Sequence, residues 1–225
     1  MKARTVLTVL ATFAMGGVML SAPIPSDAQV KKEGSKYLFR IKWQKGKKYS
    51  YNMTTSTTMP GADKPMAQNA SYTMLVKSVA NGTATIETTT NGMGQTSSQT
   101  MKVDNRGKTV EVQGANGFSN EFAQFPANAV GIGDKWTVNS SPMQGMSVKS
   151  TNTLKGFKTI NGKQYAHINS QMTISGQFGG TGSADTLIDM ADGMNLRSTI
   201  GMKANVDTGN GQKMNLTMAI KVERK

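Results

Sequence analysis

The chain has 225 residues, with 26 Lys or Arg against 13 Asp or Glu, no Cys and one His. The lack of Cys excludes a disulfide scaffold, a cysteine-based zinc site, a thiol catalyst and a lipid-modified N-terminal cysteine. The single imidazole, His167, excludes every mechanism that needs two.

The first 28 residues are typical of a secretory signal peptide. Lys2 and Arg4 precede an uncharged apolar run over 6–20, and Ala28 ends a small-residue cleavage site. Cleavage there leaves a mature chain, 29–225, with 24 basic and 12 acidic residues and a net charge of +12. We therefore expect export to the periplasm or the extracellular space. We also expect a protein that does not span the membrane, because no later stretch offers the ~20 apolar residues that a helix needs.

The mature chain alternates apolar and polar residues with a period of two, which predicts antiparallel strands with one dry face. The first alternating run covers 37–43, and a second at 49–53 follows a turn at 44–47. Residues rich in Gly, Asn and Asp predict further hairpin turns at 81–82, 104–107, 161–162 and 191–193.

The last part of the chain shows the clearest alternation. Two runs, 194–206 and 214–222, flank a Gly/Asn-rich turn at 207–211 and predict a long hairpin. In the first run, Ser198 falls on the apolar side and Asn195 on the polar side. A helix is predicted only at 119–125, where Pro126 would end it.

The two halves of the mature chain resemble each other. The segment 46–52 is similar to 133–139, and 72–82 is similar to 152–162. We predict an internal repeat over about 36–114 and 133–225. The two related meanders would form a single all-β domain over 29–225, built as an antiparallel curved sheet or open half-barrel.

Motifs for catalysis are absent from the sequence. No nucleophile lies next to a base in a known pattern, and the alternation places His167 on a wet strand face. The cluster of Asp185, Asp189 and Asp192 borders a turn, where Asp is common for backbone reasons. We therefore expect a non-enzymatic protein with no cofactor and no metal site among these carboxylates.

Fourteen methionines remain in the mature chain. Thioethers bind Cu(I), and Met143 with Met146 is the exposed pair that suits this hypothesis. Methionine on the dry face of strands indicates instead an adaptable apolar lining. We therefore predict a site for an apolar or lipid-like ligand on the concave face, formed by these residues: Trp43, Tyr51, Met202 and Met218.

The basic residues are concentrated near the start of the mature chain, where eight lie within 31–48. We predict that Lys36, Arg40 and Lys42 form a face for anionic headgroups or envelope polymers. Solubility and protection of strand edges by lysine would explain the same residues. Nucleic acid is not an expected partner, because exposed aromatic residues do not alternate with the basic ones.

Several of these segments also resemble a known group of proteins. The pattern of 37–43, Gly133-Asp134-x-Trp136, and 153–157 followed by Asn161-Gly162 resembles exported bacterial proteins of a domain-of-unknown-function family. The resemblance implies a bacterial envelope protein and brings no catalytic residues. More loosely, the leader, the length and the continuous strands are similar to the lipoprotein carriers LolA and LolB, which implies an unclosed barrel that holds acyl chains.

Our hypothesis from the sequence is a non-enzymatic exported protein of the cell envelope that binds an apolar or lipid-like ligand. One alternative is a structural or assembly protein of the envelope. Another is a Cu(I)-binding protein that uses methionine.

Overall fold

The structure is a computed structural model that describes residues 30–61, 64–92, 94–113, 124–143, 145–176, 178–207 and 213–225. Within these ranges the protein forms β-strands and no helix. Among the described residues there is accordingly no helix with the length and hydropathy to cross a membrane. The predicted signal peptide and nearly all of the helix expected at 119–125 lie outside the described residues, and Gln124 and Phe125 at its end are not helical.

The strands form one large sheet and one small hairpin. The sheet has eleven antiparallel strands in the order β7-β6-β5-β4-β3-β13-β12-β11-β10-β9-β8, and β1 pairs only with β2. Their bounds are β1 Lys31–Glu33, β2 Lys36–Leu38, β3 Lys48–Thr58, β4 Met66–Ala80, β5 Thr83–Gly92, β6 Gln95–Val103, β7 Thr109–Gln113, β8 Lys135–Met143, β9 Met146–Ile160, β10 Lys163–Gly176, β11 Phe178–Asp189, β12 Asn195–Asp207 and β13 Lys213–Arg224.

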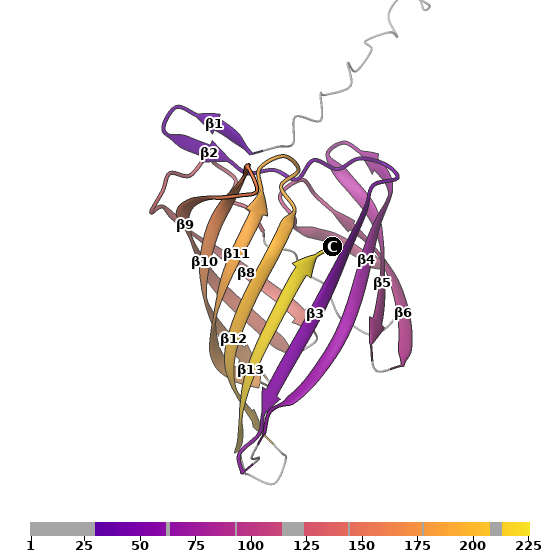
Figure 1. The fold of residues 1–225 in the computed structure, drawn as a ribbon, viewed down its shortest axis with the longest axis vertical. Helices are drawn as coiled ribbons and strands as arrows, with labels where there is room; N and C mark the ends of the chain where they lie inside the picture. Colours follow the sequence, from indigo (N-terminus) through magenta and orange to yellow (C-terminus); the bar gives the residue numbers. More distant parts are fainter. Residues whose placement is uncertain are drawn as a thin grey trace, which may run out of the picture.

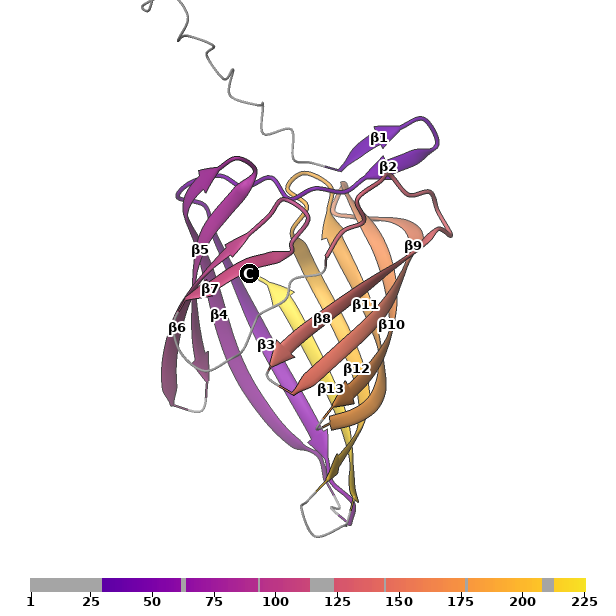
Figure 2. The ribbon, with the colours of Figure 1, turned by 180° about the vertical axis from the view of Figure 1, so that it is seen from behind.

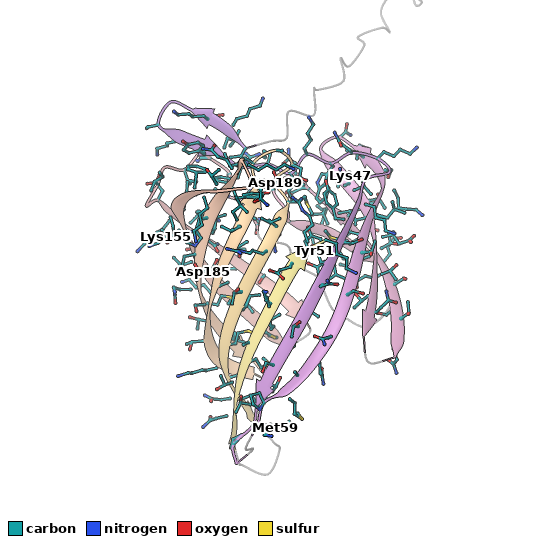
Figure 3. All side chains as sticks on the ribbon, viewed as in Figure 1. Lys47, Tyr51, Met59, Lys155, Asp185 and Asp189 are labelled. Carbon is teal, nitrogen blue, oxygen red and sulfur yellow. The ribbon has the colours of Figure 1, made fainter. Side chains whose placement is uncertain are left out.

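The sheet curls into a half-barrel that does not close, which confirms the predicted fold class (Figures 1 and 2). The first long strand, β3, pairs with the last, β13, from Thr58 opposite Thr217 to Tyr51 opposite Arg224. This pairing joins a meander of β3–β7 to a meander of β8–β13. The strands β7 and β8 are left as the two free edges. We call the end with the turns 104–107 and 190–193 the wide end, and the end near Met59 the narrow end (Figure 3).

The predicted hairpin turns are present where Gly and Asn allow them. Asn81 and Asn161 both have φ of 50°, and Gly82 and Gly162 follow with φ of 73° and 75°. These angles suit a tight two-residue hairpin turn, which Asn-Gly adopts with little strain. The two equivalent turns connect β4 to β5 and β9 to β10.

The alternation predicted for 37–43 is real, but a strand there is wrong beyond Leu38. Residues 39–47, which we call the strap, cross the wide end and join no sheet. The Ile41 amide donates to the Asn105 carbonyl at 2.7 Å, and the Lys42 amide donates to the Asp192 carbonyl at 2.8 Å. Alternate side chains are buried here because an extended segment can cover a hydrophobic opening as well as a strand can, and those side chains are Phe39, Ile41 and Trp43.

The hydrophobic core lies at the wide end, beneath the strap. Four of its side chains are completely buried and belong to one continuous cluster: Phe39, Ile86, Val103 and Leu154. This burial of the strap against the sheet supplies the main hydrophobic stabilisation at the opening. The core therefore occupies one end of the half-barrel.

Matched features of the two meanders support the predicted duplication, which remains a proposal. Val76 exchanges backbone hydrogen bonds with residues 46–47, as Leu154 does with 133–134. A bulge follows each, at Lys77 and at Lys155. Beyond the bulge, each arm of the β9–β10 hairpin is two residues longer than the corresponding arm of the β4–β5 hairpin. The hydrogen bonds and bulges therefore align Val76 with Leu154, whereas alignment of the two Asn-Gly turns pairs Val76 with Gly156.

Glycines in β11 allow the sheet to curve tightly. A Cβ atom on Gly180 would lie 2.3 Å from the Lys203 carbonyl oxygen, whereas a Cβ atom on Gly201 would meet nothing within 4 Å. Neither glycine has a positive φ, so only the contact distinguishes the two positions. The close approach of β11 to β12 therefore depends on the absence of a side chain at Gly180.

We predict that Gly180→Ala lowers the free energy of unfolding by about 1–3 kcal/mol, because the new methyl group must push the β12 backbone away. Gly201→Ala is the matched control and should change stability by no more than about 0.5 kcal/mol. Urea denaturation of both variants measures the difference. Equal stability of the two variants would contradict the tight packing of β11 on β12.

Candidate functional site

The concave face of the half-barrel encloses a cavity of about 550 Å³. Every strand of the large sheet except β6 contributes to its lining. Its volume falls within the range of ~300–1,000 Å³ that is typical of small-molecule sites. The interior is therefore hollow rather than packed solid, and both free edges border it, through Thr109 on β7 and Val138 on β8.

The strap closes the cavity at the wide end. Ile41 from the strap and Phe125 from the segment before β8 are buried and line the cavity. Arg40 holds these two segments together, because its Nη1 donates to the Pro126 carbonyl at 3.0 Å and its Nη2 to the Ala127 carbonyl at 2.6 Å. A Cβ atom on Gly193 would lie 2.2 Å from the Arg40 carbonyl oxygen.

A charged cluster lies beside the strap at the same end. Arg224 donates to the carboxylates of Asp189 and Asp192, the latter at 3.0 Å, and the three side chains are only 16%, 12% and 22% exposed. Burial raises the pKa of Asp192, although its hydrogen bond from the Met194 amide and the Arg224 charge act the other way. Arg224 bridges the two carboxylates and thereby holds the turn 190–193 against the end of β13.

The tyrosines near this cluster stay protonated. Burial raises the pKa of Tyr72 to about 12 and that of Tyr51 further still. The two rings stack with their centroids 4.7 Å apart. Tyr51 lies in the half of the barrel nearer the wide end (Figure 3). Both residues therefore present neutral hydroxyl groups, and both line the cavity.

Part of the cavity wall is polar and satisfies its own hydrogen bonds. Asn152 accepts a bond from Ser170 at 2.6 Å and another from Ser150 at 3.0 Å. On the neighbouring strands, the hydroxyls of Thr186 and Ser198 lie 2.9 Å apart. All five residues line the cavity. This part of the wall needs no further partner.

Four other polar atoms are buried without a hydrogen-bond partner in the described part of the protein, and all four belong to residues that line the cavity. They are Tyr51 Oη, Thr88 Oγ1, Thr109 Oγ1 and Asn195 Oδ1. Leaving a buried polar group unpaired costs about 1–3 kcal/mol, so such groups are few in native proteins. Their gathering around one cavity indicates a place where a bound molecule completes the bonding.

Two of these four residues face inward because of bulges. The pairing of β11 with β12 skips Leu196, so Asn195 pairs with Ile188. The pairing of β6 with β7 likewise skips Val110, so Thr109 pairs with Val103. The alternation had placed Asn195 on the wet side, and that prediction is wrong because a bulge shifts the phase of a strand.

The structure places the four predicted ligand-binding residues in three locations. Tyr51 lines the cavity. Trp43 is buried in the strap, where its Nε1 donates to the Asp104 carbonyl at 3.1 Å, and it does not line the cavity. Met202 and Met218 do not line the cavity: they pair across β12 and β13 in the direction of the narrow end, on the same face as the lining residue Ile200.

The predicted anionic-partner residues lie around the wide end. Lys36 is 3.4 Å from Asp134, and both side chains are substantially exposed. The Arg40 guanidinium donates hydrogen bonds to the backbone carbonyls of Pro126 and Ala127. Lys42 is half-buried and belongs to the strap. Of these three, Arg40 has the least capacity for an external anion.

The other residues considered from the sequence lie apart from the cavity. His167 Nε2 is 2.9 Å from Asp185 Oδ1, and neither residue lines the cavity. This hydrogen bond is the largest cause of the lowered pKa of Asp185. Met143 and Met146 are backbone partners across the β8–β9 hairpin, but the Met143 side chain lies outside the described residues.

The alternation in the sequence predicted an apolar surface, and the polar residues that line the cavity were not identified from it. A signal for part of it was present, because Ser198 stands among the apolar residues of its run. Ser170 and Thr186 also occupy dry-face positions. The bulges that turn Thr109 and Asn195 inward leave no such mark in the alternation.

The chain was compared with family models, curated proteins and solved structures. No family model and no curated protein matches the chain. Among solved structures, a DUF1329 family protein from Desulfovibrio piger is 9% identical, covers 80% of this chain and 84% of its own, and has a TM-score of 0.22. A protein of unknown function with a hot dog fold from Alicyclobacillus acidocaldarius is 12% identical, covers 88% and 96%, and has a TM-score of 0.16.

These TM-scores are too low for either likeness to carry an argument about structure or function. The expected resemblance to an uncharacterised exported family of β-rich proteins therefore remains a prediction. The resemblance to LolA and LolB remains a prediction.

The contact between Gly193 and the strap can be tested by substitution. Gly193 and Gly162 have nearly equal φ values of 73° and 75°, so alanine brings the same backbone strain to both turns. Only at Gly193 would the new Cβ atom collide with the strap, at the Arg40 carbonyl. We predict that Gly193→Ala loses about 1–3 kcal/mol more stability than Gly162→Ala. Thermal or urea unfolding measures this, and equal losses would contradict the contact.

A second prediction concerns the cluster of Arg224, Asp189 and Asp192. Arg224→Gln should lower the free energy of unfolding at neutral pH by about 3 kcal/mol, because two buried carboxylates lose their cation. Burial already raises the pKa of Asp192, and loss of the Arg224 charge raises it further above the unfolded value of ~4, so the loss of stability should grow as pH rises through that value. Urea unfolding at acidic and neutral pH checks this.

Lys221→Gln on the same strand is the control. Lys221 is 58% exposed and forms an ion pair with Glu223 at 3.1 Å, so its loss should cost no more than about 0.5 kcal/mol. If the two variants are equally stable at neutral pH, the cluster does not have the role described.

Proposed function

We propose that the protein is a non-enzymatic, exported protein of the cell envelope that binds an apolar or lipid-like ligand inside the half-barrel. The observation that carries this proposal is the cavity of about 550 Å³, whose lining residues carry all four buried polar atoms that lack a partner within the described part of the protein. Export rests on the signal-peptide pattern at 1–28, with the periplasm or the extracellular space as the destination.

The composition of the lining supports an apolar ligand with polar groups. Aliphatic and thioether side chains alternate with hydroxyls around the cavity, and among the former are Met53, Met74, Met172, Met194 and Ile200. Methionine adapts to ligands of different shape because it is unbranched and flexible. Burial of an apolar chain here would be worth about 0.8 kcal/mol per CH₂ group.

A filled cavity should abolish binding. Ala184 lines the cavity, and Ala184→Phe would place a ring inside it. Ala219 is exposed on the outer side of β13, so Ala219→Phe adds the same ring without entering the cavity. We predict that Ala184→Phe weakens binding of a fluorescent apolar probe at least tenfold and that Ala219→Phe binds as the wild type does.

Native mass spectrometry and lipid extraction of the purified wild-type protein test the proposal directly. We expect a bound apolar molecule that Ala184→Phe lacks. An empty wild-type protein that also fails to bind apolar probes would refute the proposal.

The free sheet edges favour a second candidate, a structural or assembly role in the envelope. The edges β7 and β8 have no strand beyond them, and Val110 on β7 is 61% exposed. Exposed edges can pair with a strand of another protein. A stable protein partner whose binding is lost with Val110→Lys, while apolar probes do not bind, would favour this role.

Two further proposals rest mainly on the sequence. Lys36 and Lys42 would face anionic headgroups or envelope polymers at the wide end. A Cu(I) site at Met143 and Met146 would show stoichiometric binding in an anaerobic titration that is lost when both residues are replaced by Leu.

A further inference from the structure

We propose that the ligand is an uncharged amphiphile with a hydroxyl-bearing polar group and a flexible apolar chain, and that its polar group binds at the wide end of the cavity. This inference rests on the proposed function and specifies the ligand of the same site. It follows from three features of the lining: the position of the unpaired polar atoms, their hydrogen-bonding chemistry, and the presence of only one charged residue, the exposed Lys108, in the described lining.

The unpaired polar atoms lie toward the wide end. Asn195 opens β12 directly after the turn 190–193, and Thr109 opens β7 directly after the turn 104–107. Both of these turns accept hydrogen bonds from the strap. Tyr51 lies opposite Arg224, whose guanidinium binds the first of these turns. A ligand that pairs with these residues must therefore present its polar part beneath the strap.

These atoms require both donors and acceptors from the ligand. The Asn195 oxygen only accepts, so it needs an O–H or N–H group. The hydroxyls of Tyr51, Thr88 and Thr109 can donate as well as accept. Tyr51 and Thr88 are each only 1% exposed, so bulk water reaches their hydroxyl groups poorly. A ligand hydroxyl satisfies both kinds of partner, whereas a carboxylate offers no donor to Asn195.

The surroundings also disfavour a charged ligand. Lys108 is the one charged residue in the described lining, and its side chain is exposed. At the wide end, the carboxylates of Asp189 and Asp192 are already bound to Arg224. A carboxylate buried there would lose its hydration, and the one cation of the described lining, Lys108, is exposed to water, which weakens its attraction for an anion. An ammonium group would find no free carboxylate in the lining.

The opposite part of the concave face suits a flexible chain. Met172, Gly182, Met202 and Met218 are consecutive partners across β10 to β13, and they form a row toward the narrow end. Met172 and Met202 both extend over Gly182, since a Cβ atom there would lie 3.1 Å from Met172 Cε and 3.0 Å from Met202 Cγ. Three thioethers in one row can adjust to chains of different length.

Three probes with the same chain separate these properties. They are 1-monomyristoylglycerol, which carries hydroxyls, methyl myristate, which is neutral and has no donor, and myristate, which is charged at pH 8. We expect 1-monomyristoylglycerol to displace a bound apolar fluorophore at a concentration about tenfold lower than either of the others, as one buried hydrogen bond to the site implies.

A pair of variants distinguishes a role in binding from a role in folding. Thr88→Val is nearly isosteric and removes an unpaired hydroxyl, so the free protein should become equally or more stable. The same variant should weaken binding of 1-monomyristoylglycerol several-fold and leave methyl myristate unaffected. Thr199→Val, on the exposed side of β12, is the control and should change neither property.

The outcomes separate the two proposals. If none of the three probes binds, the proposed ligand-binding function itself is refuted. If the probes bind but myristate is the tightest, or all three are equal and Thr88→Val has no effect on them, binding stands and the assignment of an uncharged hydroxylated ligand is overturned.

Discussion

The architecture depends on the backbone pairing of β3 with β13. Each meander alone would be a sheet with a partly exposed hydrophobic face, and this pairing joins the two into one curved surface. It also brings Arg224 to Asp189 and Asp192, so the last residues of the final strand secure the turn that the strap crosses. Because the sheet ends in the free edges β7 and β8, it surrounds an interior that its own side chains do not fill.

The hydrophobic core and the cavity meet on the concave face, and residues such as Ile41, Tyr51 and Met74 belong to both. Large side chains such as Phe39 of the strap and Leu154 of β9 are fully buried in the core. Farther in, the lining contains Ala184, Ser170 and Ser198, whose small side chains leave space. Packing density in the core normally leaves few voids larger than a water molecule. A hollow interior that contains unpaired polar groups is therefore better explained by binding than by stability.

Much of the fold could be predicted from the sequence, because strand alternation and turn chemistry are local properties. The Asn-Gly turns, the antiparallel strands and the inward position of Tyr51 all follow from residue patterns. The strap could not be distinguished from a strand, since both bury every second residue. Asn195 was misplaced for a different reason: a bulge depends on the pairing with β11, which a single strand does not reveal.

The same limit explains what could be predicted of the site. Aromatic and methionine residues on the dry face indicated an apolar surface, and Tyr51 was identified in this way. Trp43 does not line the cavity; it is buried in the strap, where its Nε1 donates a hydrogen bond to the Asp104 carbonyl. The polar half of the site depends on which hydroxyls lack partners after folding, and only the arrangement of all the strands determines this.

The central claim is that a ligand occupies the interior of the half-barrel, and methyl NMR of methionine tests it most directly. Met53, Met74, Met172 and Met194 line the cavity, whereas Met66 is 49% exposed on β4. With ¹³C-methyl methionine and a saturating apolar ligand, the account predicts large chemical-shift changes at the four lining residues and none at Met66. Changes confined to exposed methionines, with the four interior signals unmoved, would contradict it.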